Sequence, residues 1–203
     1  MSEEATVAAK QLLDHGDELF ARTPTLTTLH ITDAAGLFEA LAQLPHLERL
    51  TTLGLSGNWV TPAEARALAK SPHLAGLKHL TMDNCALGDE GLREFALSST
   101  LVHLRAWFLT DNGLTDDGLA TVADSPRFPE VASLCFGNYG VSPKRYDSIT
   151  RQGLWRLAGS SLLTSLAAIH WYELTDRRDV ADAPTSEEFP RGVRLVTHVE
   201  QIW

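Results

Sequence analysis

The chain has 203 residues with a formal net charge of −9, and 44% of them are hydrophobic, which is the balance of a soluble globular protein able to bury a core. The acidic excess argues against nucleic-acid binding, because affinity for the phosphate backbone comes mainly from clustered Lys and Arg. No apolar run approaches the roughly 20 residues that cross a bilayer, and the opening Met1-Ser-Glu-Glu lacks the pattern of a secretory signal, so we expect a cytoplasmic protein without a membrane partner.

Residues 1–24 are predicted to form an N-terminal helical cap. The apolar residues of its stretch LLDHGDELF are expected on one helix face that covers the first repeat of the chain. A weak strand pattern follows in LTTLHI, residues 26–31, and apolar residues continue over 36–44. A stacked repeat array needs such a cap, because its end otherwise exposes the core.

A 27-residue period organises the middle of the chain. Leu50, Leu77, Leu104 and Val131 are each 27 residues apart, and they open the stretches LTTLGLSGNWV, LKHLTMDNCAL, LRAWFLTDNGL and VASLCFGNYGV. The first, fourth, sixth and eleventh places are apolar, which predicts a strand with one buried face. The ninth place holds Asn58, Cys85, Asn112 and, as an exception, Tyr139. The side chains of Asn58, Cys85 and Asn112 are expected to hydrogen-bond the backbone of the turn.

A helix is expected after each turn. Thr61-Pro-Ala-Glu64 is a capping box with Pro at the first helical position, and Thr115 precedes Asp116 and Asp117, two acids suited to a helix N-terminus. Apolar residues at helical spacing follow. The helices are expected to end in register at Ser71-Pro72, Ser98-Ser99 and Ser125-Pro126.

The period breaks once, near the C-terminal end. Val131 and Leu166 are 35 residues apart, eight more than one repeat. Because Ile149–Gly153 realigns with Leu114–Gly118, the extra residues fall within 139–148. Such a loop is either a binding device or a tolerated lengthening that costs little stability. A weak repeat, LAAIHW, follows at 166–171, and residues 192–199 are predicted to form a final strand.

The repeated pattern resembles the leucine-rich-repeat consensus L-x-x-L-x-L-x-x-N/C-x-L. The long helices, the A-x-S-P-x-L helix ends, and the stretches LLDHGDELFARTP and EEFPRGVRLV are similar to a group of bacterial proteins of the ribonuclease-inhibitor class. The resemblance implies an α/β solenoid, a right-handed horseshoe arc with parallel strands on the concave face and helices on the convex face. We expect one domain over 1–203, with a helical cap at 1–24, about six repeats over 25–174 and a C-terminal cap at 175–203.

In this fold the second, third, fifth and seventh places of each strand point out from the concave face. The fifth-place row would be His30, Gly54, Thr81, Phe108, Cys135 and His170. Aromatic and Arg side chains dominate the energy of protein interfaces, so the middle and end of the arc are favoured for binding. The candidate partner-binding residues, on this face and in the inserted loop, are Lys78, His79, Asp83, Arg105, Phe108, Tyr139, Lys144, Arg145, Tyr146, His170 and Tyr172. The alternative is that they are ordinary exposed strand residues.

The sequence also predicts where three tryptophans and the two cysteines lie in the fold. Trp59 follows the first ninth-place Asn at the rim, where it is either exposed or, as we favour, folded back on the neighbouring turn. Trp107 and Trp171 occupy inward places and are predicted to be core. Cys85 and Cys135 are predicted to be unpaired thiols, since they lie at different places of repeats two apart.

Motifs for catalysis and metal binding are missing. The chain has no G-x-S-x-G, no phosphate-binding glycine loop and no H-E-x-x-H, and its Asp-rich turn lacks the closing Glu of a calcium loop. We therefore predict no enzyme, no metal and no cofactor, but a protein-interaction module that acts as an adaptor, scaffold or inhibitor. The alternatives are a recognition module of a larger modular system and an enzyme that uses the concave face.

Overall fold

The computed structural model describes residues 3–138, 147–174 and 189–200. Eight strands form one sheet in chain order, and each strand pairs in parallel with the next. The strands are β1 Glu3–Ala8, β2 Leu26–Thr32, β3 Thr52–Gly54, β4 His79–Thr81, β5 Ala106–Phe108, β6 Ser133–Gly137, β7 Ala168–Leu174 and β8 Arg194–Glu200.

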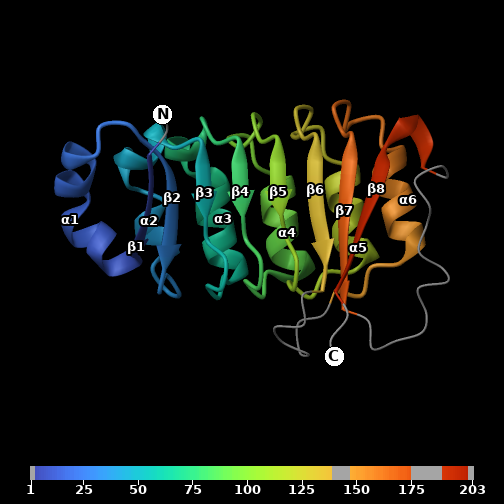
Figure 1. The fold of residues 1–203 in the computed structure, drawn as a ribbon, viewed down its shortest axis with the longest axis horizontal. Coiled ribbons are helices and arrows are strands. Elements are labelled where there is room, and N and C mark those ends of the chain that lie inside the picture. Colours follow the sequence, from blue (N-terminus) through green and yellow to red (C-terminus); the bar gives the residue numbers. More distant parts are fainter. Residues whose placement is uncertain (1–2, 139–146, 175–188, 201–203) are drawn as a thin grey trace.

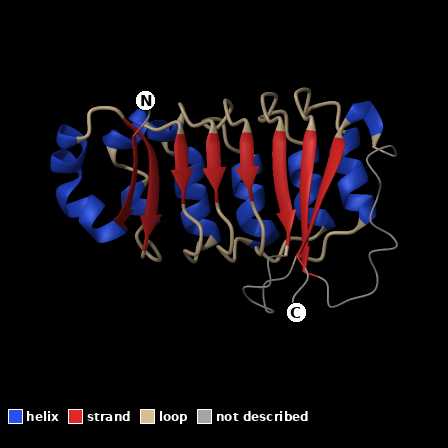
Figure 2. Ribbon diagram, viewed as in Figure 1, coloured by secondary structure: helices blue, strands red, loops and turns tan. Residues whose placement is uncertain are grey.

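Helices connect the strands and lie on one face of the sheet, while the other face carries no helix in the described part of the chain (Figures 1 and 2). The α-helices are α1 Ala9–Arg22, α2 Phe38–Leu41, α3 Pro62–Lys70, α4 Gly88–Ala96, α5 Asp116–Ala123 and α6 Arg151–Gly159. Short 3-10 turns are η1 Pro45–Arg49, η2 Pro72–Leu74 and η5 Pro190–Gly192. This arrangement confirms the predicted α/β architecture. We call the uncovered side the helix-free face; it is the one expected to be concave.

The N-terminal segment differs from the sequence prediction, because it is not helical throughout. Residues 3–8 form β1, which pairs in parallel with β2, and only then does α1 begin. Pairing brings Val7 beside Ile31 and Ala5 beside Leu29, so that β1 extends the sheet by one strand. At the other end, the strand predicted over 192–199 is present as β8.

The 27-residue period sets the register of the central strands. Leu53 pairs with Leu80, Leu80 with Trp107 and Trp107 with Leu134, so equivalent side chains stack behind the sheet. The inward-facing residues of these repeats belong to one buried cluster, which includes Leu53, Leu55, Leu80, Leu109, Leu134 and Phe136. Trp107 is fully buried between Phe95 and Phe128, and its indole Nε1 is the one buried side-chain N or O atom of the described residues without a hydrogen-bond partner.

Two ladders of side-chain hydrogen bonds tie each repeat to the one before it. The ninth-place Asn112 accepts from the backbone N–H groups of Cys85 and Leu87, and its amide donates to the carbonyl oxygen of Met82. The serines that end the helices donate to helix-terminal carbonyls one repeat earlier. These bonds are Ser71 to Ala42, Ser98 to Ala69, Ser125 to Ala96 and Ser160 to Ala123. Both ladders supply hydrogen bonds to buried carbonyl or N–H groups that would otherwise have no partner at the end of a helix or turn.

The tryptophan predictions have mixed outcomes. Trp107 is core, as predicted, whereas Trp171 is only partly buried and packs against the core cluster. Trp59 is 58% exposed, so the favoured expectation that it folds back on the neighbouring turn is wrong. Neither cysteine takes part in a disulfide, as predicted, and both are buried. No helix in residues 3–138, 147–174 or 189–200 is long and apolar enough to cross a membrane.

Candidate partner-binding surface

The helix-free face carries three rows of side chains, from the third, fifth and seventh places of each repeat. Strand pairing aligns residues of the same place, for example Thr81 with Phe108 and Cys135 with His170. Over β2 and β3 the rows hold mostly Thr, Ser and Gly, whereas rings gather over β7 and β8. The rows from β2 to β8 are Thr28, Thr52, His79, Ala106, Ser133, Ala168 and Arg194; His30, Gly54, Thr81, Phe108, Cys135, His170 and Val196; and Thr32, Ser56, Asp83, Thr110, Gly137, Tyr172 and His198.

Several of these places are buried, contrary to the sequence expectation for the fifth and seventh rows. Gly54 lies under the His30 ring, with which an added Cβ would clash. Thr110, Gly137 and Cys135 are also buried. Burial raises the pKa of the Cys135 thiol to about 12, with a further contribution from Asp83, so this thiol is not a nucleophile at neutral pH. Small side chains on a packed face are covered by larger neighbours, which a single-repeat pattern does not reveal.

A ring cluster, consisting of His170, Tyr172 and His198, occupies the C-terminal end of this face. Nδ1 of His170 lies 3.2 Å from Nε2 of His198, and the Tyr172 ring stacks on the His198 ring with centroids 4.3 Å apart. Burial, followed by His198 and Arg194, lowers the pKa of His170. The 3.2 Å separation fits a hydrogen bond in which one of these two ring nitrogens donates its N–H to the other.

Two residues of the ring cluster, His170 and Tyr172, are predicted from the sequence, whereas His198 is not. His198 and Arg194 both lie on the helix-free face because β8 continues the alternation of the earlier strands, with Leu195 buried between them. The sequence of the predicted final strand already indicates the orientation of these two side chains. Its buried positions Val193 and Leu195 fix which neighbours point outward.

Asp83 is held in a hydrogen-bond network of its own. Its Oδ1 accepts from the backbone N–H and the hydroxyl of Thr110 at 3.0 and 2.6 Å, and its Oδ2 accepts from Ser56 at 3.4 Å. The carboxylate thus links three adjacent repeats. A partner could contact Asp83 only at its remaining exposed edge.

The basic candidates Lys78, His79 and Arg105 lie where β4 and β5 begin, at the opposite end of the strands from Asp83. Lys78 and His79 are exposed where β4 begins, and His79 shares a hydrogen bond with Thr52 at 3.3 Å. Arg105 contacts Glu130 at 3.4 Å. Phe108, half-buried in β5, lies in the row between Thr81 and Cys135, closer along the sheet to the ring cluster. The structure therefore divides the predicted surface into a basic edge and an aromatic end.

The inserted loop lies outside the described residues from 139 to 146, which includes the candidates Tyr139, Lys144, Arg145 and Tyr146. The next residue, Asp147, is described and is buried in the turn after β6. Oδ1 of Asp147 accepts from the N–H groups of Asn112 and Leu114 at 3.1 and 2.9 Å, and Oδ2 accepts from Gly137 at 3.0 Å. Burial raises the pKa of Asp147 to about 7, although these three bonds oppose the shift.

Asp147 makes the hydrogen bonds of the ninth place in this repeat. Its bonds to Asn112 and Leu114 repeat those that Asn112 makes to Cys85 and Leu87. The sequence pattern puts Tyr139 at that place, and Tyr139 lies outside the described residues. The realignment of Ile149 with Leu114, continued back by two residues, would have found Asp147.

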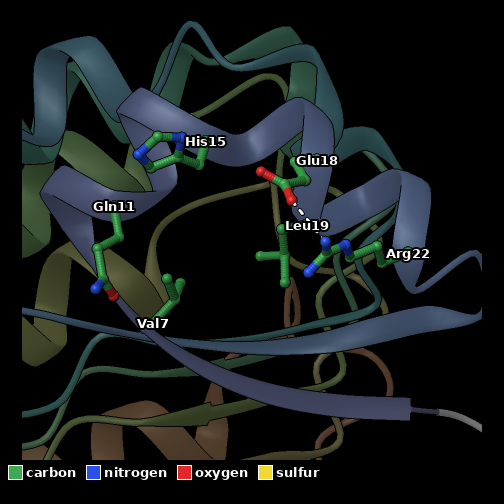
Figure 3. Close-up of a pocket in the computed structure, with 6 residues that line it drawn as sticks. All are labelled: Val7, Gln11, His15, Glu18, Leu19 and Arg22. Carbon is green, nitrogen blue, oxygen red and sulfur yellow. Dashed lines mark ion pairs between the residues drawn. The ribbon is translucent and has the colours of Figure 1, made fainter.

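The described surface offers few other sites for chemistry. No group of three or more His, Cys, Asp or Glu among the described residues could hold a metal ion. One hollow of about 270 Å³ lies between β1 and α1, where Val7 and Leu19 face it and the Glu18–Arg22 ion pair of 2.9 Å stands at its edge (Figure 3). That pair is exposed, and its two charges neutralise each other.

The parallel sheet, the 27-residue stacking and the ninth-place ladder together define a leucine-rich-repeat solenoid. Comparison with protein families agrees, since a family model described as Leucine Rich repeat matches residues 76–96 and 100–123. The matched segments run from just before β4 to the end of α5. The leucine-rich repeats predicted from the sequence are thus confirmed. The chain has no match among the curated proteins.

Proposed function

We propose that this solenoid binds a partner protein through the helix-free face, with the ring cluster and Phe108 as the centre of the contact. Leucine-rich-repeat domains are generally protein-interaction modules, and repeat solenoids use their extended sheet faces for binding. The observation that carries the proposal is the gathering of stacked, partly exposed rings at one end of a face that is otherwise small and polar. Large rings with a polar edge are typical of binding hot spots.

The inserted loop belongs to the same proposal. It leaves the sheet directly after β6, and β6 lies beside β7, which carries His170 and Tyr172. Lys144 and Arg145 form a basic pair in a chain of net charge −9, which favours an acidic partner surface. We propose an adaptor, scaffold or inhibitor role rather than catalysis, and a cytoplasmic location, which the two free thiols support.

The class of repeat is also proposed. α3, α4 and α6 have nine residues each and α5 has eight, and these long helices favour the ribonuclease-inhibitor class and the bacterial group named above.

The test begins with a partner recovered by pull-down from the native host and then measured by calorimetry. Tyr172→Ala, a loop deletion that removes 139–146 but keeps Asp147, and a Lys144→Ala, Arg145→Ala double variant should each weaken binding. Removing one hot-spot ring costs about 2 kcal/mol, or roughly thirtyfold in affinity. Thr28→Ala, on the same face over β2, is the matched control. Equal affinity for all variants, with unchanged thermal melts, would place the contact on another surface.

A further inference from the structure

A hollow at the rim of the solenoid arises because the second repeat helix is short. α2 has four residues, whereas α3 and α4 have nine each. The resulting space of about 430 Å³, which we call the rim hollow, is within the size range of side-chain and ligand pockets. It is lined by Ala35, Gly36, Glu39, Trp59, Thr61 and Glu64.

Later repeats close the equivalent space. There Asp89 accepts from the backbone and hydroxyl of Thr115, and Asp116 does the same for Thr150. These acids press so closely on Gly118 and Gly153 of the following helix that an added Cβ would clash. Gly118 and Gly153 correspond to Glu64 in α3, and Thr115 and Thr150 correspond to Thr61, which donates to Glu64 itself. Beside the rim hollow, a carboxylate on α3 therefore replaces the contact between an acid of the preceding repeat and a glycine.

Trp59 forms the aromatic wall of the rim hollow. The same place is occupied by Ala86, Gly113 and Ser148 in the later repeats, so the fold itself requires only a small residue there. Trp59 nevertheless leaves 58% of its surface exposed. A large exposed indole beside a hollow is a feature of interaction sites, because Trp is enriched among the residues that dominate binding energy.

The remaining walls are acidic. Glu64 is 6% exposed, and its oxygens accept from Gly36 N–H at 2.9 Å and from the backbone and hydroxyl of Thr61 at 3.0 and 2.8 Å. Glu39 is exposed on α2. No Lys, Arg or His is among the residues that line the hollow. An acidic wall beside an indole face attracts a cation, since the ring quadrupole and the carboxylate both favour positive charge.

We propose that the rim hollow binds the guanidinium group of an arginine side chain presented by a partner protein. Guanidinium suits the site better than ammonium, because it is planar, weakly hydrated and able to stack on Trp59 while donating two hydrogen bonds to Glu39. The inference extends the proposed partner-binding role to a second contact, at the rim beside β3. It can be tested without the partner, so its failure is separate from failure of the helix-free-face proposal.

The test is an NMR titration of the full chain, labelled with ¹⁵N, with N-acetyl-arginine amide. The indole N–H signal of Trp59 and the amide signals of Gly36 and Thr61 should shift and saturate. Glu39→Gln should weaken binding about fivefold, as expected for loss of one partly exposed charge contact, and Trp59→Ala should abolish saturation at Gly36. Trp155→Ala, which removes a 39% exposed indole on α6, is the matched control and should leave binding unchanged.

Two further probes test whether binding needs a positive charge and whether it prefers guanidinium to ammonium. N-acetyl-norleucine amide has the apolar stem without the charge, and N-acetyl-lysine amide has an ammonium group instead. Equal shifts with norleucine would overturn the charge assignment, and equal affinity for lysine would overturn the preference for guanidinium. Absence of saturable shifts with arginine, or full retention of binding in both Glu39→Gln and Trp59→Ala, would overturn the site itself.

Discussion

Replacing Asp147 with Asn should change the way in which stability depends on pH. Asp147 is 7% exposed, and its carboxyl group sits between the turns of two repeats. Burial raises the pKa of Asp147 to about 7, and the nearby Asp111 adds to the shift, while the N–H groups of Leu114, Gly137 and Asn112 act against it. The Asn variant cannot ionise, so it isolates the charge from the shape of the side chain.

The sign follows from the proton balance. An Asp in an unfolded chain has a pKa of about 3.9. Between about pH 4 and pH 7 the native state therefore holds a proton that the unfolded chain has released, and the free energy of unfolding falls as pH rises through this window. A shift of about three units corresponds to a loss of about 4 kcal/mol as an upper limit. Below pH 4 both states are protonated and the effect disappears.

Asp147→Asn should lack this loss. The amide keeps the Oδ1 contacts to Asn112 and Leu114 but gives up the bond that Gly137 donates to Oδ2, which costs about 1–3 kcal/mol. The variant should thus be less stable than the native protein at pH 4 and as stable or more stable at pH 8. The two stability curves should converge or cross as pH rises.

Urea unfolding between pH 4 and pH 8.5 measures both curves. Asp14→Asn, an exposed position on α1, is the control and should run parallel to the native protein. Parallel curves for Asp147→Asn and the native protein would refute the reasoning. A native protein that gains stability relative to the variant from pH 4 to pH 7 would show instead that the three N–H bonds outweigh burial.

Three other predictions concern the core, the thiols and the ring cluster. Leu80→Ala should lower the free energy of unfolding by about 2–5 kcal/mol through the cavity it leaves, and an unchanged denaturation midpoint would contradict the repeat register. Thiol titration without reductant should count Cys85 and Cys135 in the unfolded protein and react with neither quickly in the native one, because both are buried; a count of zero after unfolding would reveal a bridge. In an NMR titration, His198→Ala should raise the pKa of His170 toward its ordinary value by reducing burial and removing the second imidazole, and no change would mean that His198 does not act on it.

The candidate surface was only partly predictable. Phe108, His170 and Tyr172 follow from the strand alternation, because successive side chains of a strand point to opposite faces of the sheet. Cys135 follows the same rule and is nevertheless buried, since its exposure depends on the size of the side chains in the neighbouring rows. The ring cluster needed β8, whose His198 is 28 residues away from His170 in the chain.

The sequence by itself determined the repeat, the core and the caps of the central helices. Those features are local or strictly periodic: an apolar residue at a fixed place in every repeat, and the Thr61 capping box within four residues. The tertiary structure alone decided that residues 3–8 add a strand, because β1 forms only by pairing with β2. It also decided that Trp59 lies beside an open hollow. Each of these depends on how an irregular segment meets its neighbour, and periodicity cannot describe a contact that occurs once.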